Sequence, residues 1–140
     1  MLIVRESYPT LKLSGGLVDE SQSIYIHFGG EFGKQSLTWT FPNGATIKFA
    51  AFPDRKEEWL GLQVTNVLVD EAASFTEDEI IFLNSRLRGV KYKGKCNFTM
   101  TCNPDRNSFL YNWVEYCLDP ETGVPKKGTE NIVRWFVNFG

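Results

Sequence analysis

Cysteine and histidine are scarce in this 140-residue sequence, which limits the metal and redox chemistry that it can support. It contains three cysteines, Cys96, Cys102 and Cys117, and one histidine, His27. The number of cysteines is odd, none has C-x-x-C spacing, and His27 is far from them in sequence, so a structural zinc site is not expected. The same composition favours a reduced, cytosolic setting over a disulfide-stabilised one.

Long apolar runs and an excess of positive charge are also absent. The apolar start at residues 1–4 is interrupted by Arg5 and Glu6, too soon for a signal peptide or a membrane span, so we expect a soluble, intracellular protein without a membrane partner. The net charge of −2 argues against a globally basic nucleic-acid binder but is compatible with a local basic strip. With 42% hydrophobic residues, the chain can bury the core of about one domain.

The apolar pattern predicts several strands. Uninterrupted apolar runs at 2–4 and 66–69 are typical of strands buried on both faces. The runs 36–41 and 45–49 flank Pro42-Asn43-Gly44, a turn sequence that predicts a β-hairpin covering or extending a sheet edge. Further strands are predicted at 96–101 and 132–139.

Three helices are predicted between these strands. The first ends at Gly29-Gly30. The second begins at Ser74 or Thr76, which form overlapping capping boxes with Glu77 and Glu79, and runs to about Arg88 with Gly89 as its stop. The third begins at Asn107 or Ser108. The residues expected on the inward faces are Leu17, Val18, Ile24, Tyr25 and Phe28 in the first helix, Ile80, Leu83, Asn84 and Leu87 in the second, and Phe109, Leu110, Trp113, Val114 and Cys117 in the third. This order of elements predicts an α/β fold with a mainly parallel sheet, in a single domain of residues 1–140.

Two acidic residues, Asp70 and Glu71, directly follow the apolar run 66–69. The carboxyl ends of parallel strands form the edge at which open α/β sheets bind ligands. In the nucleotide-binding form of this pattern, the Walker B element, the first carboxylate holds Mg²⁺ through its waters. The second orients and deprotonates the water that attacks the γ-phosphate. Consecutive side chains of an extended strand point to opposite sides, which would suit two separate tasks. A solvated strand end that feeds a helix N-terminus explains the same residues, and both interpretations stay open.

Polar residues also end the strand predicted at 96–101, in Thr101-Cys102-Asn103-Pro104. In a parallel sheet this strand would lie beside the run 66–69, with Thr101 and Asn103 near the acidic pair. Such residues can sense a γ-phosphate and relay its loss to moving parts. An ordinary turn favoured by Asn-Pro is the alternative.

A phosphate-binding loop of the form G-x-x-x-x-G-K-[ST] is missing. The nearest segment, 29–35, has one residue too few between its glycines, carries Gln35 in place of the hydroxyl residue, and precedes a hairpin strand instead of a helix. It is interpreted as a helix stop followed by a loop. We expect the true loop to precede residue 1.

Together these motifs resemble the large terminase subunit of tailed bacteriophages. The resemblance runs in the same order along essentially the whole chain, through the segments 2–9, 39–47, 67–72 with 75–77, 83–89 and 101–104. Members of that family are motors that use ATP to drive viral DNA into preformed capsids, and they join an N-terminal ATPase to a C-terminal RNase H-like nuclease.

The resemblance implies an incomplete sheet of the P-loop NTPase (RecA/ASCE-like) type with an added hairpin. It gives Asp70 the Mg²⁺ role, Glu71 the catalytic role, and Thr101, Cys102 and Asn103 a coupling role. The intact protein would use Mg²⁺ and ATP. Its partners would be double-stranded DNA, a portal protein and a small terminase subunit, and it would work in the host cytoplasm with a homo-oligomeric ring as a possible assembly. The phosphate loop would precede residue 1 and the nuclease would follow residue 140. This chain alone is therefore expected not to hydrolyse ATP, and neither Mg²⁺ nor ATP is expected to bind tightly to it.

Two roles stay open for several basic residues. Arg5 ends a strand where the family often has arginine, so it is either close to the nucleotide or an ordinary salt-bridged strand end. Leu60 stands where many members carry a basic residue before the glycine that precedes Walker B, which leaves Arg55 as a weak candidate for an arginine finger. A basic strip either contacts DNA phosphates or forms a solvated helix end; it consists of Arg86, Arg88, Lys91, Lys93 and Lys95. The tryptophans Trp39, Trp59, Trp113 and Trp135 are interpreted as core or edge cover.

Two other functions fit the same residues. One is a different P-loop motor, such as a helicase-type ATPase. The other is a non-catalytic prophage remnant or interaction module.

Overall fold

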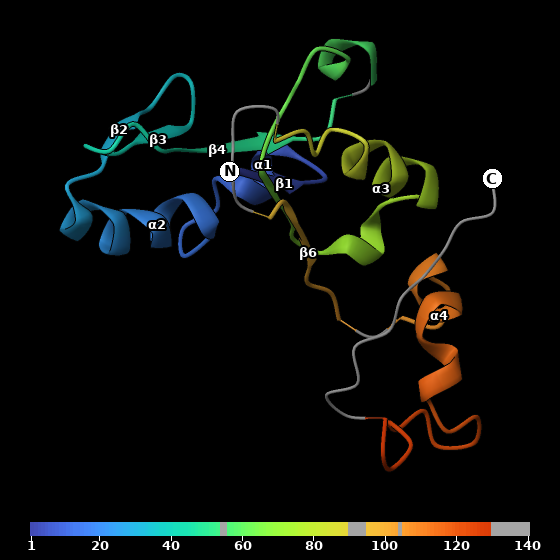
Figure 1. Ribbon diagram of the computed structural model, residues 1–140. Helices are drawn as coiled ribbons and strands as arrows, with labels where there is room; N and C mark the ends of the chain where they lie inside the picture. Colours follow the sequence, from blue (N-terminus) through green and yellow to red (C-terminus); the bar gives the residue numbers. More distant parts are fainter. Residues whose placement is uncertain (54–55, 90–94, 104, 130–140) are drawn as a thin grey trace. The chain divides into compact units, whose positions relative to one another are not determined.

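The computed structural model describes residues 1–53, 56–89, 95–103 and 105–129. The chain divides into two compact units, Met1–Asn103 and Pro104–Gly140, where the sequence leads us to expect one domain. The first unit contains a six-stranded sheet (Figure 1). The elements are β1 Leu2–Arg5, α1 Tyr8–Leu11, α2 Leu17–Tyr25, β2 Glu31–Gly33, β3 Thr38–Thr40, β4 Thr46–Ala51, β5 Asn66–Val69, α3 Glu77–Asn84, β6 Asn97–Met100 and α4 Phe109–Val114, with 3₁₀ turns at Ile26–Phe28, Lys56–Trp59, Ala72–Ser74 and Glu115–Cys117.

The sheet is mainly parallel, which confirms that part of the predicted fold class. Its strand order is β2-β3-β4-β1-β5-β6. Strands β4, β1, β5 and β6 run parallel, and β2 and β3 form an antiparallel extension at one side. The central strand β1 is buried over Leu2, Ile3 and Val4, as its uninterrupted apolar run predicts.

The predicted hairpin is confirmed, and it extends the sheet. Gly44 has φ +81°, and the Asn43 side chain accepts a 2.9 Å hydrogen bond from the Ala45 amide, which fixes the turn. At Lys48, strand β4 pairs with Thr38 of β3 on one side and Leu2 of β1 on the other. The hairpin is thereby continuous with the parallel part of the sheet.

The segment around Gly29 and Gly30 ends a helical stretch, as predicted, but the residues after it form a strand as well as a loop. Gly29 has φ +70° and caps the 3₁₀ turn. Strand β2 then pairs antiparallel with β3, with Phe32 opposite Trp39. Placement in an edge strand agrees with the rejection of this segment as a phosphate loop.

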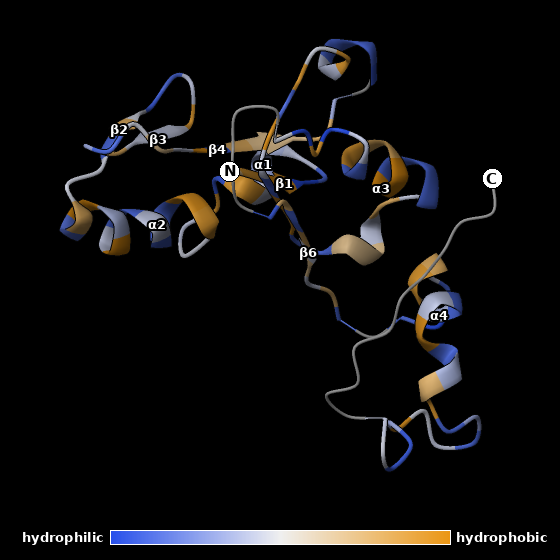
Figure 2. Ribbon diagram, in the orientation of Figure 1, coloured by the Kyte–Doolittle hydropathy of each residue, from blue (hydrophilic) through white to orange (hydrophobic). Residues whose placement is uncertain are grey.

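A cluster around Trp39 forms the core between α2 and the β3–β4 part of the sheet. Trp39 is 3% exposed, and its indole nitrogen donates a 2.9 Å hydrogen bond to the Ser21 hydroxyl. Figure 2 shows α2 with apolar and polar residues interleaved along its length. The predicted inward face was wrong in part, since Val18 is buried whereas Ile24 and Phe28 are 50% and 69% exposed. The α-helix ends at Tyr25 and tightens into a 3₁₀ turn, which changes the angular spacing of the residues beyond it.

Helix α3 begins as one of the two predicted capping boxes requires. The Thr76 hydroxyl accepts from the Glu79 amide, and the Glu79 carboxylate accepts from the Thr76 amide. The helix ends at Asn84, four residues before the predicted end. The backbone at 86–88 instead pairs with Val64, whose amide donates to the Arg86 carbonyl and whose carbonyl accepts from the Arg88 amide.

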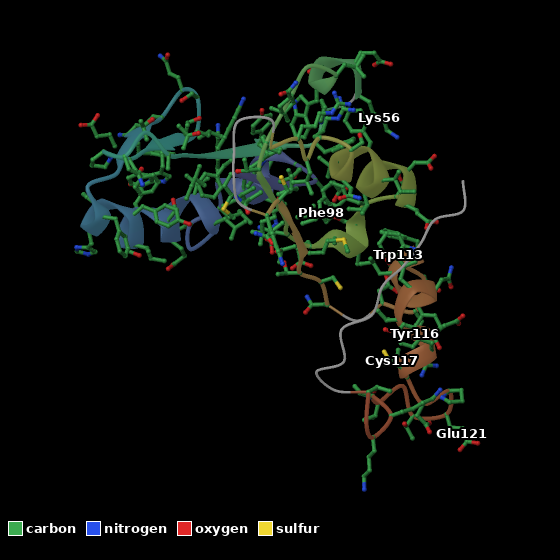
Figure 3. All side chains as sticks on the ribbon, in the orientation of Figure 1. Lys56, Phe98, Trp113, Tyr116, Cys117 and Glu121 are labelled. Atoms are coloured by element: carbon green, nitrogen blue, oxygen red, sulfur yellow. The ribbon has the colours of Figure 1, made fainter. Side chains whose placement is uncertain are left out.

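The second unit contains α4, which Ser108 caps as predicted. Figure 3 shows Trp113, Tyr116 and Cys117 along α4 and the 3₁₀ turn after it. None of the residues of α4 is fully buried. Phe109, Leu110 and Trp113 are half-buried, whereas Val114 is 42% exposed, so the predicted inward face was wrong in part. The helix has only six residues, too few for a continuous apolar stripe. The predicted strand at 132–139 and Trp135 lie outside the described residues.

Within the described ranges, no helix has the length and apolar character that crossing a membrane requires.

Candidate functional site

Three polar residues occupy one row at the carboxyl edge of the parallel sheet. Val4 of β1 pairs with Val69 of β5, and Val69 pairs with Met100 of β6. The next residue of each chain segment is Arg5, Asp70 and Thr101, respectively. The pairing register of the three strands thus brings together Arg5, Asp70 and Thr101, which are far apart in sequence, at the edge where such sheets bind ligands.

Asp70 is held from both neighbouring strands. Its Oδ1 accepts a 2.8 Å hydrogen bond from the Thr101 hydroxyl, and its Oδ2 lies 3.2 Å from Arg5 Nε. Its backbone amide donates to the Val4 carbonyl at 2.9 Å. The Asp70 side chain is only 21% exposed. Each of its two carboxylate oxygens therefore has a protein partner at a half-buried position.

Arg5 uses each of its guanidinium nitrogens for a different partner. Besides the Nε contact with Asp70, one terminal nitrogen donates a 2.9 Å hydrogen bond to the Thr10 carbonyl in α1. The other forms an ion pair with Glu71 Oε1 at 3.8 Å. The salt-bridged strand end considered for Arg5 is therefore present, and its partners are the two residues of the candidate site.

Glu71 departs from the geometry that the sequence suggests. Its backbone has φ +56° and ψ +48°, the left-handed region that residues other than glycine rarely adopt. The strand ends at Val69, so Asp70 and Glu71 do not project to opposite sides of an extended segment, and that part of the sequence argument was wrong. The Glu71 carbonyl accepts hydrogen bonds from the amide and hydroxyl of Ser74, which hold the turn in place.

The strand end at Thr101 is tied to the acidic segment through its backbone as well. The Thr101 amide donates to the Val69 carbonyl, and the Thr101 carbonyl accepts from the Ala72 amide at 2.8 Å. Cys102 and Asn103 come next in the chain and are exposed. The structure thus brings Thr101 against Asp70, as the parallel-sheet argument predicts.

The basic strip separates into buried and exposed residues. Arg86 is 7% exposed, and its guanidinium donates to the Leu60 carbonyl at 2.6 Å and lies 4.8 Å from the centre of the Phe82 ring. Arg86 is thus committed to internal contacts, and its assignment to a DNA-contacting strip was wrong. Arg88 and Lys95 are exposed. Lys91, Lys93 and Arg55 lie outside the described residues.

Two features of the site were not predicted from the sequence. The position of Arg5 between Asp70 and Glu71 depends on the register of β1 and β5, although its place at a strand end was a usable signal. A groove of about 680 Å³ also runs along this edge, lined among others by Glu6, Lys56, Phe75 and Glu79. Its residues come from the segments after β1, β4 and β5, including the 3₁₀ turn at Lys56 and the first turn of α3 at Glu79, and periodicity does not reveal how such segments meet.

Comparison with known proteins gives one family and a set of solved structures. Residues 4–134 match the family model described as the N-terminal part of the terminase large subunit, T4likevirus-type. The large terminase of thermophilic bacteriophage D6E is similar in fold, with TM-scores of 0.54 for its complex with ADP and 0.55 for a second crystal form, at 16% and 15% identity. The match covers 74% of this chain and 25% or 26% of the D6E chain, so this chain spans about a quarter of that relative. None of the curated proteins matches.

Proposed function

Because this chain belongs to the T4-type family of terminase large subunits, we propose that it carries the Walker B and coupling residues of an ATP-driven motor that packages viral DNA. The observation that supports this most directly is the row of Arg5, Asp70 and Thr101 at the carboxyl edge, with Glu71 beside it. In this proposal the sheet is the P-loop NTPase type, and a phosphate loop supplies the rest of the nucleotide site.

The residues present suit a magnesium ion. Asp70, Glu71 and Thr101 supply the oxygen donors that Mg²⁺ prefers. The two carboxylates already attract a cationic group, the Arg5 guanidinium, which is an observation of this structure that fits a cation-binding edge. Asp70 would hold the ion, and Mg²⁺ would neutralise charge on the β- and γ-phosphates.

Glu71 is proposed as the general base. Its side chain is 43% exposed against 21% for Asp70, so it can reach a water molecule outside the sheet edge. A carboxylate in hydrogen-bond reach of that water orients it and takes its proton as the water attacks phosphorus. The turn from Glu71 to Ser74 fixes the position of this carboxylate relative to Asp70.

Thr101, Cys102 and Asn103 are proposed as the coupling segment. Thr101 contacts Asp70 through its hydroxyl and Ala72 through its carbonyl. A change in the charge around Asp70 therefore acts directly on the end of β6 and on the exposed residues after it. Such a strand end can pass the loss of the γ-phosphate to a part that moves DNA.

The experiment joins this chain in one polypeptide to a G-x-x-x-x-G-K-[ST] segment encoded in the same genome and measures ATP hydrolysis. We expect Glu71→Gln to lower kcat by on the order of 10²–10⁴-fold while ATP affinity is kept, since the substitution removes only the base. Glu57→Gln, an exposed glutamate outside the site, is the matched control and should hydrolyse ATP at the parent rate. Equal rates in both variants would instead favour the non-catalytic remnant or interaction module.

Contact with double-stranded DNA is a separate part of the proposal, and it rests on Arg88 and Lys95. Both side chains are exposed and positively charged. If they contact phosphates, replacing both with Gln should lower the slope of log affinity against log salt by about 2, because each phosphate contact releases roughly one counterion. An unchanged slope would remove these two residues from the DNA-contacting set.

A further inference from the structure

We propose that Arg5 is the resident cation of the Asp70–Glu71 pair and that a divalent cation binding at Asp70 displaces the Arg5 Nε contact, leaving Arg5 to position Glu71. This inference deepens the proposed function and rests on it. In this inference the Arg5 guanidinium neutralises the carboxylate pair first, and the divalent cation then replaces it at Asp70.

The first step is the geometry of the guanidinium. Its three nitrogens contact groups from three places in the fold: Asp70 at 3.2 Å, Glu71 at 3.8 Å and the Thr10 carbonyl at 2.9 Å. The planar guanidinium presents its donors in fixed, divergent directions that suit three separated partners, whereas a lysine ammonium is a compact charge without such fixed geometry. The backbone of Arg5 is also fixed, because its carbonyl accepts from the Phe52 amide.

The second step is the charge. Asp70 and Glu71 carry two negative charges at one sheet end, and Arg5 compensates one of them. Asp70 Oδ1 is occupied by the Thr101 hydroxyl, and Oδ2 faces Arg5. A divalent cation at Asp70 therefore meets a positive charge within a few ångströms, and the two cations repel each other in a half-buried setting where screening is reduced.

The third step is the anchor. The hydrogen bond to the Thr10 carbonyl does not involve either carboxylate, so it persists when the Nε contact with Asp70 breaks. Thr10 itself is held by its hydroxyl, which donates to the Ser7 carbonyl at 2.8 Å. Arg5 then keeps one fixed contact and the ion pair with Glu71, whose left-handed backbone already restricts where its carboxylate can lie. Arg5 is thus a positioning residue and not a catalytic one.

The first measurement is divalent-cation affinity of the 140-residue chain without nucleotide, by calorimetric titration with Mg²⁺ and with Mn²⁺. Removing the competing charge in Arg5→Gln should tighten binding by on the order of three- to tenfold. Arg5→Lys retains the charge and should stay within about twofold of the parent. Arg106→Gln, which removes an exposed arginine outside the cluster, should leave the affinity unchanged, and Asp70→Asn should abolish the binding.

The second measurement tracks Arg5 itself in the parent chain, by the NMR signal of its Nε–H group after ¹⁵N labelling of arginine. Mg²⁺ should shift this signal, whereas NaCl at the same ionic strength should not, since only a bound ion displaces the Nε contact. The spectrum of Arg5→Lys, which lacks the signal, assigns it. Because this measurement is made on the parent, it stands even where a variant folds poorly.

Four results would overturn the proposal. The first three are equal cation affinity in the parent and Arg5→Gln, no cation binding in either, and an Arg5 signal that Mg²⁺ does not move. Binding in Arg5→Lys as tight as in Arg5→Gln would also overturn it, because the effect would then not depend on charge. None of these results depends on hydrolysis. The proposed function fails separately, through an unchanged kcat in Glu71→Gln.

Discussion

The Thr101 hydroxyl donates a 2.8 Å hydrogen bond to Asp70 Oδ1 and joins two strand ends that are 31 residues apart in sequence. The backbone reinforces this link, because the Thr101 amide donates to Val69 and its carbonyl accepts from Ala72. The side-chain bond therefore orients the Asp70 carboxylate, while the backbone bonds hold the strands together. Substitutions at Thr101 can separate the two roles.

We predict that Thr101→Val lowers the free energy of unfolding by about 0.5–1.5 kcal/mol, the usual value of one side-chain hydrogen bond. Valine keeps the shape and the backbone bonds but removes the donor to Asp70. Thr101→Ser keeps the hydroxyl and should therefore retain most of the free energy of unfolding that Thr101→Val loses. Urea denaturation of the first unit's cooperative transition measures both, and a serine variant as unstable as the valine variant would show that the methyl group matters more than the hydrogen bond.

The left-handed backbone of Glu71 predicts an unusual order of stability. At φ +56° a side chain strains the backbone whereas glycine does not, so Glu71→Gly should be more stable than Glu71→Ala by about 1 kcal/mol. Both variants lose the same carboxylate, so the comparison isolates the backbone. Denaturant titration gives the difference.

A control position in a regular helix should show the opposite order. Glu20 is exposed within α2, where alanine should exceed glycine by about 1 kcal/mol because glycine is a poor helix former. If alanine were more stable than glycine at both Glu71 and Glu20, the backbone of Glu71 would not be strained. Strain of this kind concentrates at functional sites, which is why the order bears on the assignment of Glu71.

The two arginines in the segment that follows α3 should differ sharply in their effect on stability. Arg86 is buried and donates to the carbonyls of Leu60 and Trp59, so Arg86→Ala should cost about 2–4 kcal/mol through lost charged hydrogen bonds and unpaired carbonyls. Arg88 is exposed, and Arg88→Ala should change stability by less than about 0.5 kcal/mol. Thermal unfolding of both variants measures the difference, and equal losses would contradict the structural role of Arg86.

The parallel strands and the row of site residues were predictable because they depend on local pattern and simple geometry. The apolar runs at 2–4 and 66–69 mark strands, the first buried throughout and the second at its alternate residues Val67 and Val69, and parallel strands bring their carboxyl ends to one edge. The position of Asp70 next to Thr101 results from those two facts. The location of the candidate site was therefore predictable from the sequence.

The roles of individual arginines were not predictable in the same way. A run of basic residues looks alike whether its members are solvated or buried, and the partners of Arg86 lie 26 and 27 residues away in the chain. Arg5 acquires its two carboxylates only when β1 and β5 pair in register. The early end of α3 has a similar cause, since pairing with Val64 takes the backbone that the helix would need.

The contact between Trp39 and Ser21 gives a last prediction, on how α2 is fixed to the sheet. Both side chains are buried, at 3% and 5% exposure, and the indole N–H donates to the hydroxyl at 2.9 Å. Ser21→Ala leaves the indole donor buried without this partner, and we expect a loss of about 1–3 kcal/mol. Trp39→Phe removes the donor but also reduces packing, with its own cost.

The double variant distinguishes these two costs. Since Trp39→Phe has already removed the N–H group, adding Ser21→Ala should cost much less than it does alone, with a coupling free energy of about 0.5–3 kcal/mol. Denaturant titration of the four proteins gives this value. Ser23→Ala, an exposed serine on the same helix, is the matched control and should show no coupling with Trp39. Additive losses for Ser21 and Trp39 would mean that the hydrogen bond contributes nothing, and that shape alone fixes α2 against β3.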